Sequence, residues 1–237
     1  ITSAQTDTMT TDDLAALSTG AVRALTSDAL LALVAAQVGA LTTAQVQALS
    51  ATQLTSLNSD DLNALTTSQF AALSSAQVAA LSSLQADTMT TSDLAAIAAG
   101  SLKSLSTAAL AALDSAQFNA LTTAQVAAIT ATQAAAITSA QADTMTTDAL
   151  VALNSAALRA LSTDALAALD SVQIGALTNT QVAQLSTGQI ASLNSADFNA
   201  LTTGQFAALT SVQAAAITSL SMAKLSRGVS AVLVHGT

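Results

Sequence analysis

The chain has 237 residues and a net charge of -9, but only 8% of its residues are charged, and it has no cysteine. The lack of cysteine excludes a disulfide framework and thiolate chemistry. Five basic residues are too few to neutralise a run of phosphates, so nucleic acid is not an expected partner. Disordered low-complexity chains are polar and highly charged, whereas 51% of this chain is hydrophobic, which indicates a folded protein.

The first residues and the apolar runs give no sign of membrane insertion. The chain opens with ITSAQTDTM, which has neither the basic n-region nor the apolar h-region of a secretory signal. Polar residues interrupt every apolar run well before the roughly 18 residues that a membrane-spanning helix needs. We therefore expect no membrane insertion.

An eight-residue repeat, here called the octad, runs from Ile1 to Leu233 without insertion or deletion. Its first position holds Leu, Ile or Met in all 30 octads, and its second holds Ser, Thr, Asn or Asp in 27 of them. The fifth position is mostly Gln, and the sixth is a large apolar residue in 23 of 29 octads. The seventh position varies most. Its basic residues, which we expect to face solvent, are Arg23, Lys103 and Arg159.

The second and fifth positions together spell a helix N-terminus every eight residues. Thr42 with Gln45, and Thr122 with Gln125, match the capping box, in which a hydroxyl caps the helix and the residue three places later reaches back. A continuous helix does not fit, because eight residues overshoot two helical turns by about 80°. Each octad is therefore predicted to be one very short helix. In the octad that begins at Leu121, we expect the Thr122 cap to contribute more to stability than Gln125 does.

A helix of about six residues is not stable alone in water, so these helices must stack on one another. We predict an all-α repeat solenoid of very short capped helices, one per octapeptide, over residues 1–225. The alternative is a β-solenoid with one short strand per octad, because Thr, Val and Ile favour strands. Apolar spacings of five and three, however, do not match the two-residue period of a strand.

A longer repeat is superimposed on the octads. The phrase DTMTT occurs three times, beginning at Asp7, Asp87 and Asp143. It divides the chain into the predicted blocks 9–88, 89–144 and 145–224. Residues 226–237 lose the cap residues and are predicted to be a degenerate terminal cap or a junction. Because the repeat begins in phase at Ile1, we expect the chain to adjoin flanking segments of a larger array.

The middle block is three octads shorter than the first, which spans ten octads. Loss of whole turns of a solenoid would leave every later octad with the same kind of neighbour. The difference therefore suggests three octads, or 24 residues, in each turn, here called a coil. Such a coil would bring Leu121 close to Ile97 or Met145.

Reactive side chains form no catalytic or metal-binding pattern. His235 is the only histidine, so it has no second histidine or cysteine with which to bind a metal ion. The acidic residues are sparse and fall mostly at cap or first-turn positions, where they complement the helix dipole. The candidate calcium ligands are Asp12, Asp13, Asp60 and Asp61, with the DTMTT residues Asp7, Asp87 and Asp143. We predict no catalytic, cofactor or metal site, and no enzyme.

The larger apolar side chains are expected in the core rather than at a ligand. All four phenylalanines fall at the sixth octad position: Phe70, Phe118, Phe198 and Phe206. Three methionines replace leucine at the first position: Met9, Met89 and Met145. Both positions belong to the predicted apolar face of each short helix, because residues three apart lie on one side of a helix.

Tandem sequences such as LTTAQVAAI, from Leu121 to Ile129, resemble repeats of very large secreted bacterial proteins described as adhesin-like or haemagglutinin-like. The resemblance covers about residues 1–225. It implies an extracellular or cell-surface location and a structural or adhesive role, with no catalytic motif and no cofactor.

From the octads and this resemblance we expect a non-catalytic stalk, fibre or spacer segment that can self-associate laterally or end to end. The alternative is a binding module whose Ser and Thr rows meet an ordered surface such as a glycan, ice or a mineral. The direction of the hydroxyls distinguishes the two, because caps turn them inward and a binding face turns them outward.

Overall fold

A computed structural model of the protein describes the structure of residues 1–217. These residues form 27 short α-helices, one in each octad, and no strand. The finding confirms the predicted all-α solenoid and excludes the β-solenoid for this part of the chain. The predicted terminal segment 226–237 lies outside the described residues.

The chain divides into two compact units, Ile1–Ala128 (unit 1) and Ile129–Thr237 (unit 2). The helices of unit 1 are α1 Ser3–Asp7, α2 Thr11–Ala16, α3 Thr19–Arg23, α4 Ser27–Leu31, α5 Ala35–Gly39, α6 Thr43–Ala48, α7 Ala51–Ser56, α8 Ser59–Asn63, α9 Thr67–Ala71, α10 Ser75–Ala80, α11 Ser83–Thr88, α12 Thr91–Ala96, α13 Ala99–Leu102, α14 Thr107–Ala112, α15 Ser115–Asn119 and α16 Thr123–Ala127. The described helices of unit 2 are α17 Ala131–Ala134, α18 Ser139–Thr144, α19 Thr147–Ala152, α20 Ser155–Ala160, α21 Thr163–Ala167, α22 Ser171–Ala176, α23 Asn179–Gln184, α24 Thr187–Ser192, α25 Ser195–Ala200, α26 Thr203–Ala207 and α27 Ser211–Ala216.

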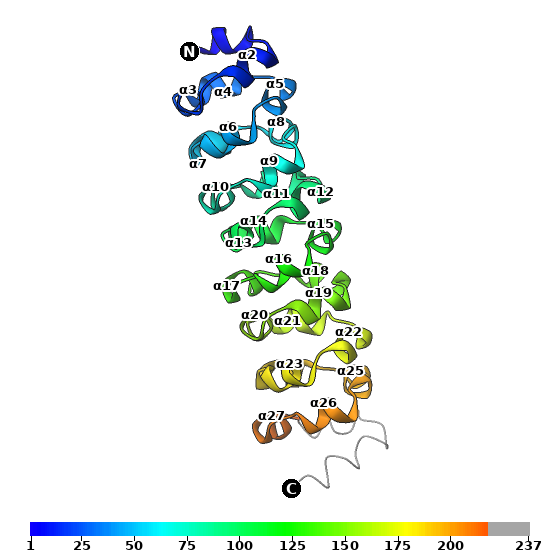
Figure 1. The fold of residues 1–237 in the computed structure, drawn as a ribbon. Helices are drawn as coiled ribbons and strands as arrows, with labels where there is room; N and C mark the ends of the chain where they lie inside the picture. The colour runs from blue at the N-terminus through cyan, green and yellow to red at the C-terminus, as the bar shows by residue number, and fades with distance from the viewer. Residues whose placement is uncertain (218–237) are drawn as a thin grey trace. The chain divides into compact units, whose positions relative to one another are not determined.

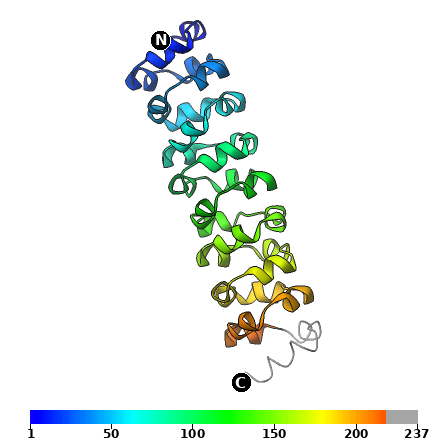
Figure 2. The ribbon, with the colours of Figure 1, turned by 45° about the vertical axis from the view of Figure 1, so that its right-hand side comes forward.

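Within each unit, a helix packs against the helix three places further along the chain. Such pairs include α1 with α4 and α9 with α12 in unit 1, and α17 with α20 and α22 with α25 in unit 2. Successive coils are stacked along each unit (Figures 1 and 2). Three octads therefore complete one coil, as the shorter middle block suggested. The helices that lead into Ile97 and Leu121, α12 and α15, form one of these pairs.

The core is built from the first and sixth octad positions. Phe70, Phe118 and Phe198 are fully buried, and Phe206 is nearly so. Met89 and Met145 are also buried, whereas Met9, near the N-terminal end of unit 1, is only half-buried. The expected core role of the aromatic residues is thereby confirmed.

Each described helix follows the second position, and in 24 of the 27 the side chain at that position caps the helix, as predicted; the exceptions are α1, α5 and α13. The Thr122 hydroxyl, for example, accepts a hydrogen bond from the Gln125 backbone N–H at 3.2 Å. The cap residues have extended backbone angles, and many first-position residues, such as Leu49, are also extended or nearly so. No described residue has a positive φ angle. The corners therefore need no left-handed residue, which fits the low glycine content of the chain.

Candidate functional site

The most regular polar feature is the glutamine at the fifth octad position. It is the third residue of its helix, and in most octads it is buried, with 1% exposure at Gln45 and Gln125. A buried amide that lacks hydrogen bonds is unfavourable by several kcal/mol in an apolar environment. The partners of these side chains therefore bear directly on what holds the coils together.

Gln125 joins two helices with one amide group. Its Oε1 accepts a hydrogen bond from the Thr122 backbone N–H at 2.7 Å, which completes the capping box of α16. Its Nε2 donates to the carbonyls of Leu94 at 2.9 Å and of Ile97 at 2.7 Å, at the end of α12. The same side chain thus caps the start of its own helix and the end of the helix four places earlier.

We call this arrangement the glutamine clamp. It recurs with the same spacing of 28 residues to a first-position carbonyl, for example from Gln77 to Leu49 and from Gln189 to Leu161. In unit 1 the clamp residues are Gln37, Gln45, Gln53, Gln69, Gln77, Gln85, Gln117 and Gln125. In unit 2 they include Gln173, Gln181, Gln189, Gln205 and Gln213.

The clamp satisfies groups that every helix leaves open. The last carbonyls of a helix have no partner within the helix, and in helices of four to six residues they are a large share of the backbone. From the sequence, these glutamines are predicted to provide only the capping-box half of this role. One signal pointed to the other half: the chain contains no glutamate, although glutamate serves a capping box as well as glutamine does. Only the amide can also donate.

Other polar side chains replace the clamp in some octads. Ser101, at the fifth position, donates its hydroxyl to the Leu73 carbonyl at 3.0 Å, again 28 residues earlier. At the seventh position, Asn63 donates to the Thr88 carbonyl at 2.8 Å in the next coil. Arg23, Lys103 and Arg159 are exposed, as expected. The seventh position therefore serves both solvent and the neighbouring coil.

Four aspartates occupy the clamp position; Asp13 is exposed, and the other three are buried: Asp61, Asp93 and Asp197. Each carboxylate accepts a hydrogen bond from its own cap residue. The donor is the Asn58 side chain for Asp61, the Thr90 hydroxyl for Asp93 and the Asn194 backbone N–H for Asp197. An ionised carboxylate has no hydrogen to donate, so these residues provide only the capping half of the clamp.

Burial raises the pKa of Asp61, and the neighbouring Asp60 raises it further, while the hydrogen bond from Asn58 opposes the shift. Burial likewise raises the pKa of Asp197, with a smaller contribution from Asp170 and opposition from the Asn194 backbone. For both aspartates, the loss of water around the carboxylate is the largest cause of the raised pKa.

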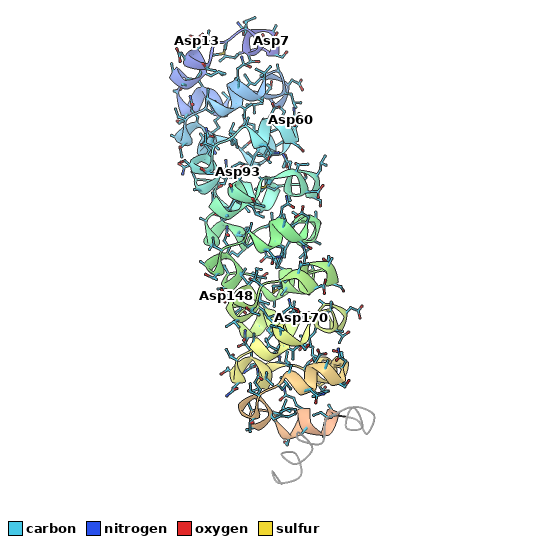
Figure 3. The ribbon with its side chains drawn as sticks, turned by 90° about the vertical axis from the view of Figure 1, so that its right-hand side faces the viewer. Asp7, Asp13, Asp60, Asp93, Asp148 and Asp170 are labelled. Atoms are coloured by element: carbon cyan, nitrogen blue, oxygen red, sulfur yellow. The ribbon has the colours of Figure 1, made fainter. Side chains whose placement is uncertain are left out.

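The other candidate calcium ligands lie on the surface. Asp12, Asp60 and the three DTMTT aspartates are exposed. Asp13 accepts hydrogen bonds from the Thr10 hydroxyl and backbone N–H, which lower its pKa. Figure 3 shows Asp7, Asp13, Asp60 and Asp93 spread over unit 1. Within residues 1–217, no group of three or more His, Cys, Asp or Glu residues is placed to hold a metal ion. His235 lies outside that range.

The hydroxyl groups divide into two sets. Those at the second octad position turn to their own helices as caps, as at Ser50, Thr66 and Thr122. Those at the third position begin the helices, and many are exposed, as at Thr43 and Thr67. No helix in the described part of the chain is long and apolar enough to span a bilayer.

Short capped helices in every octad, a packing interval of three helices and buried glutamine clamps define an octapeptide-repeat α-solenoid. The chain belongs to the ALTTAQ repeat family, whose family model matches residues 6–43, 55–91, 87–123, 144–179 and 190–227. The phrase ALTTAQ itself stands at residues 40–45 and 120–125. It runs from the small eighth residue through the core leucine and the cap threonine to the clamp glutamine. No curated protein matches the chain.

Proposed function

We propose that this chain is a non-catalytic spacer or stalk segment of a bacterial surface or secreted protein. In this proposal it adjoins flanking segments of a larger chain and self-associates laterally or end to end. The observation that carries the proposal is the glutamine clamp. Because each clamp joins one coil to the next, an added coil extends the array by repeating the same bonds, without requiring a new kind of contact.

The division of labour within an octad supports a spacer role. The first and sixth positions form the core, the second caps the helix, and the fifth clamps it to an earlier coil. The third, fourth and seventh positions remain mostly exposed, and the fourth and seventh also vary widely in the sequence. An array built this way can change its surface while its length and its internal bonds stay the same.

Length is the property that tests the proposal. In-phase copies of residues 33–56, which form one coil of unit 1, would be inserted after residue 56, and the maximum dimension would be measured by small-angle X-ray scattering. We expect equal increments for each added coil. A maximum dimension that grows only as the cube root of chain length, as in a compact globule, would contradict a spacer.

Location needs a separate experiment. Intact cells of the source bacterium would be treated with protease, and the repeat segment would be followed by antibody. Loss of the segment while a cytoplasmic marker survives is the expected result. Protection of the segment until the cells are lysed would contradict a surface location.

One observation favours a second candidate, a binding face for an ordered surface such as a glycan. Exposed threonines begin four helices that stack in one column of unit 1: Thr19 of α3, Thr43 of α6, Thr67 of α9 and Thr91 of α12. Replacing Thr43 and Thr67 by Lys should abolish binding on a glycan array, whereas Lys at Ser75 and Thr123, in another column, should not. Equal signals for the two variants would remove this candidate.

A further inference from the structure

The aspartates at the clamp position in two of the blocks lie in almost the same phrase. Asp61 lies in NSDDLNALTT, from Asn58, and Asp197 in NSADFNALTT, from Asn194. Both are nearly fully buried, with 4% and 2% exposure. A buried carboxylate at a position that elsewhere holds a hydrogen-bond donor is unexpected for a residue that serves packing alone.

The middle block shows what the donor does at this point. Its equivalent phrase is DSAQFNALTT, from Asp114, with Gln117 at the clamp position. Gln117 Nε2 donates to the carbonyls of Asp87 at 2.8 Å and Met89 at 2.7 Å. Here the acidic residue is the cap and the amide is the clamp, whereas at Asp61 and Asp197 the amide is the cap and the acid holds the clamp position.

The clamp spacing identifies the carbonyls that the two aspartates leave without a donor. A step of 28 residues back leads from Asp61 to Leu33 and from Asp197 to Leu169. Both leucines are buried, with 3% exposure each. Within the described part of the chain, neither carbonyl accepts a hydrogen bond. In the clamp register, each junction therefore pairs the carbonyl of a buried leucine with a side chain that can donate only when it carries a proton.

We propose that Asp61 and Asp197 are acid-sensitive clamps, which tighten two coil junctions when they are protonated and loosen them when they are ionised. The protonated carboxyl donates its O–H toward the Leu33 or Leu169 carbonyl, directly or through one water, and thereby takes over the role of the glutamine amide. The ionised carboxylate can only accept, and it presents a negative charge to the negative end of the earlier helix.

Among residues 1–217, the charged residues around both groups are acidic. On the helices packed against α8, the only charged residue is Asp87 of α11, because α5 has none. The α4 helix, whose end faces Asp61 in the clamp register, carries Asp28, and α8 itself carries Asp60. For Asp197, Asp170 caps α22, which packs against α25, and Asp164 lies on α21 in the clamp register. No basic residue of these elements offsets either charge.

The direction of the effect follows from proton linkage. Since burial raises the pKa of Asp61 and Asp197 above the ordinary value of 3.8, the folded chain holds these protons more tightly than the unfolded chain does. The stability that protonation contributes is complete below 3.8 and is lost as the pH rises through the raised pKa. The junctions should therefore be weakest at neutral pH and should strengthen on acidification.

The test is urea unfolding of the full chain, followed by circular dichroism at pH 7 and at about pH 5. Ordinary carboxyl groups are ionised at both values, so a change between them reports on carboxyl groups with a raised pKa. The wild-type midpoint is expected to rise at the lower pH. The Asp61→Gln, Asp197→Gln double variant should have a higher midpoint than the wild type at pH 7, because the amides complete both clamps. It should also lose most of the acid-dependent rise.

A matched control separates this effect from the general loss of charge repulsion. Asp12→Asn with Asp148→Asn also removes two charges, both from exposed first-turn positions, and should keep the wild-type pH dependence. The proposal is overturned if the double glutamine variant keeps the full acid-dependent rise, or if it is less stable than the wild type at pH 7.

Carboxyl carbon NMR titration of the wild type is independent of both variants. Titration of Asp61 and Asp197 at or below 3.8 would also overturn the proposal.

Discussion

At the scale of the residue, glutamine combines two roles that the sequence suggested only in part. Gln125 is 1% exposed and bonds to α16 through Oε1 and to the end of α12 through Nε2. We expect Gln125→Ala to lower the free energy of unfolding by about 1–3 kcal/mol, because it strands buried carbonyls. Thr122→Ala should lower it by only about 1 kcal/mol. Urea unfolding of both variants would measure the difference.

Gln5 offers a matched control for the clamp. It bonds to the Thr2 N–H at 2.8 Å through Oε1, as Gln125 does to Thr122, but it is exposed and its Nε2 donates no hydrogen bond within residues 1–217. Gln5→Ala should therefore change the free energy of unfolding by less than 1 kcal/mol. If Gln5→Ala and Gln125→Ala were equally mild, the bonds to the earlier helix would contribute little to stability.

Two glycines test how closely the coils approach. A Cβ at Gly39 would lie 2.7 Å from the Ala64 carbonyl oxygen in the next coil, whereas a Cβ at Gly100 would have no neighbour within 4 Å. Gly100→Ala should stabilise the chain by up to about 1 kcal/mol, because alanine favours a helix. Gly39→Ala should instead destabilise it, since the backbone of α8 must move. Thermal melts that gave both variants the same sign would contradict this packing.

The sequence revealed the caps but not the clamps, for a physical reason. Thr122 and its cap partner Gln125 are three residues apart, so local pattern was enough to predict their bond. The bond from Gln125 to Ile97 spans 28 residues, and its existence depends on how many octads make a coil. The burial of Asp61 also depends on the coil. From the sequence alone, an aspartate in the first turn of a helix is expected on the surface, because the octads that cover it are far away along the chain.

At the scale of the element, the helices are too short to be stable alone. They have four to six residues, below the roughly 12–15 that an isolated helix needs in water. Their stability must come from packing against the helix three places away and from clamps to the helix four places away. The octad pattern predicted one helix per repeat because the cap signal restarts every eight residues, a feature that neither a long helix nor a strand explains.

This dependence predicts a threshold in fragment length. A peptide of residues 33–56 contains α5, α6 and α7 but none of their packing partners, and we expect it to be largely unfolded. A peptide of residues 33–88 adds α8 to α11, with the pairs α5–α8, α6–α9, α7–α10 and α8–α11 and three clamps. Its helical signal per residue at 222 nm should be several times larger. Equal signals per residue would mean that the octads form helices independently.

At the scale of the whole molecule, residues about 24 apart along the chain become neighbours within a unit. Asn63 of the phrase NALTT bonds to Thr88 of the phrase DTMTT, one coil further on. Both phrases are visible in the sequence, and the length of the middle block indicates three octads per coil. The sequence does not relate the two phrases to each other, because they come into contact only when the coil has formed.

The central claim is that three octads make one coil, and a cysteine cross-link tests it most directly because the chain has no native cysteine. A Cβ at Gly175 would lie 3.7 Å from the Cβ of Ala200, within the range of about 3.5–4.5 Å that a disulfide needs. The Gly175→Cys, Ala200→Cys variant should oxidise to an internal disulfide in the folded state, detected by loss of free thiol. The same cysteine at position 175 paired with Ser192→Cys or Ala208→Cys, one octad short or one octad long, should stay reduced. Oxidation of either control pair in preference to the pair at 175 and 200 would contradict a coil of three octads.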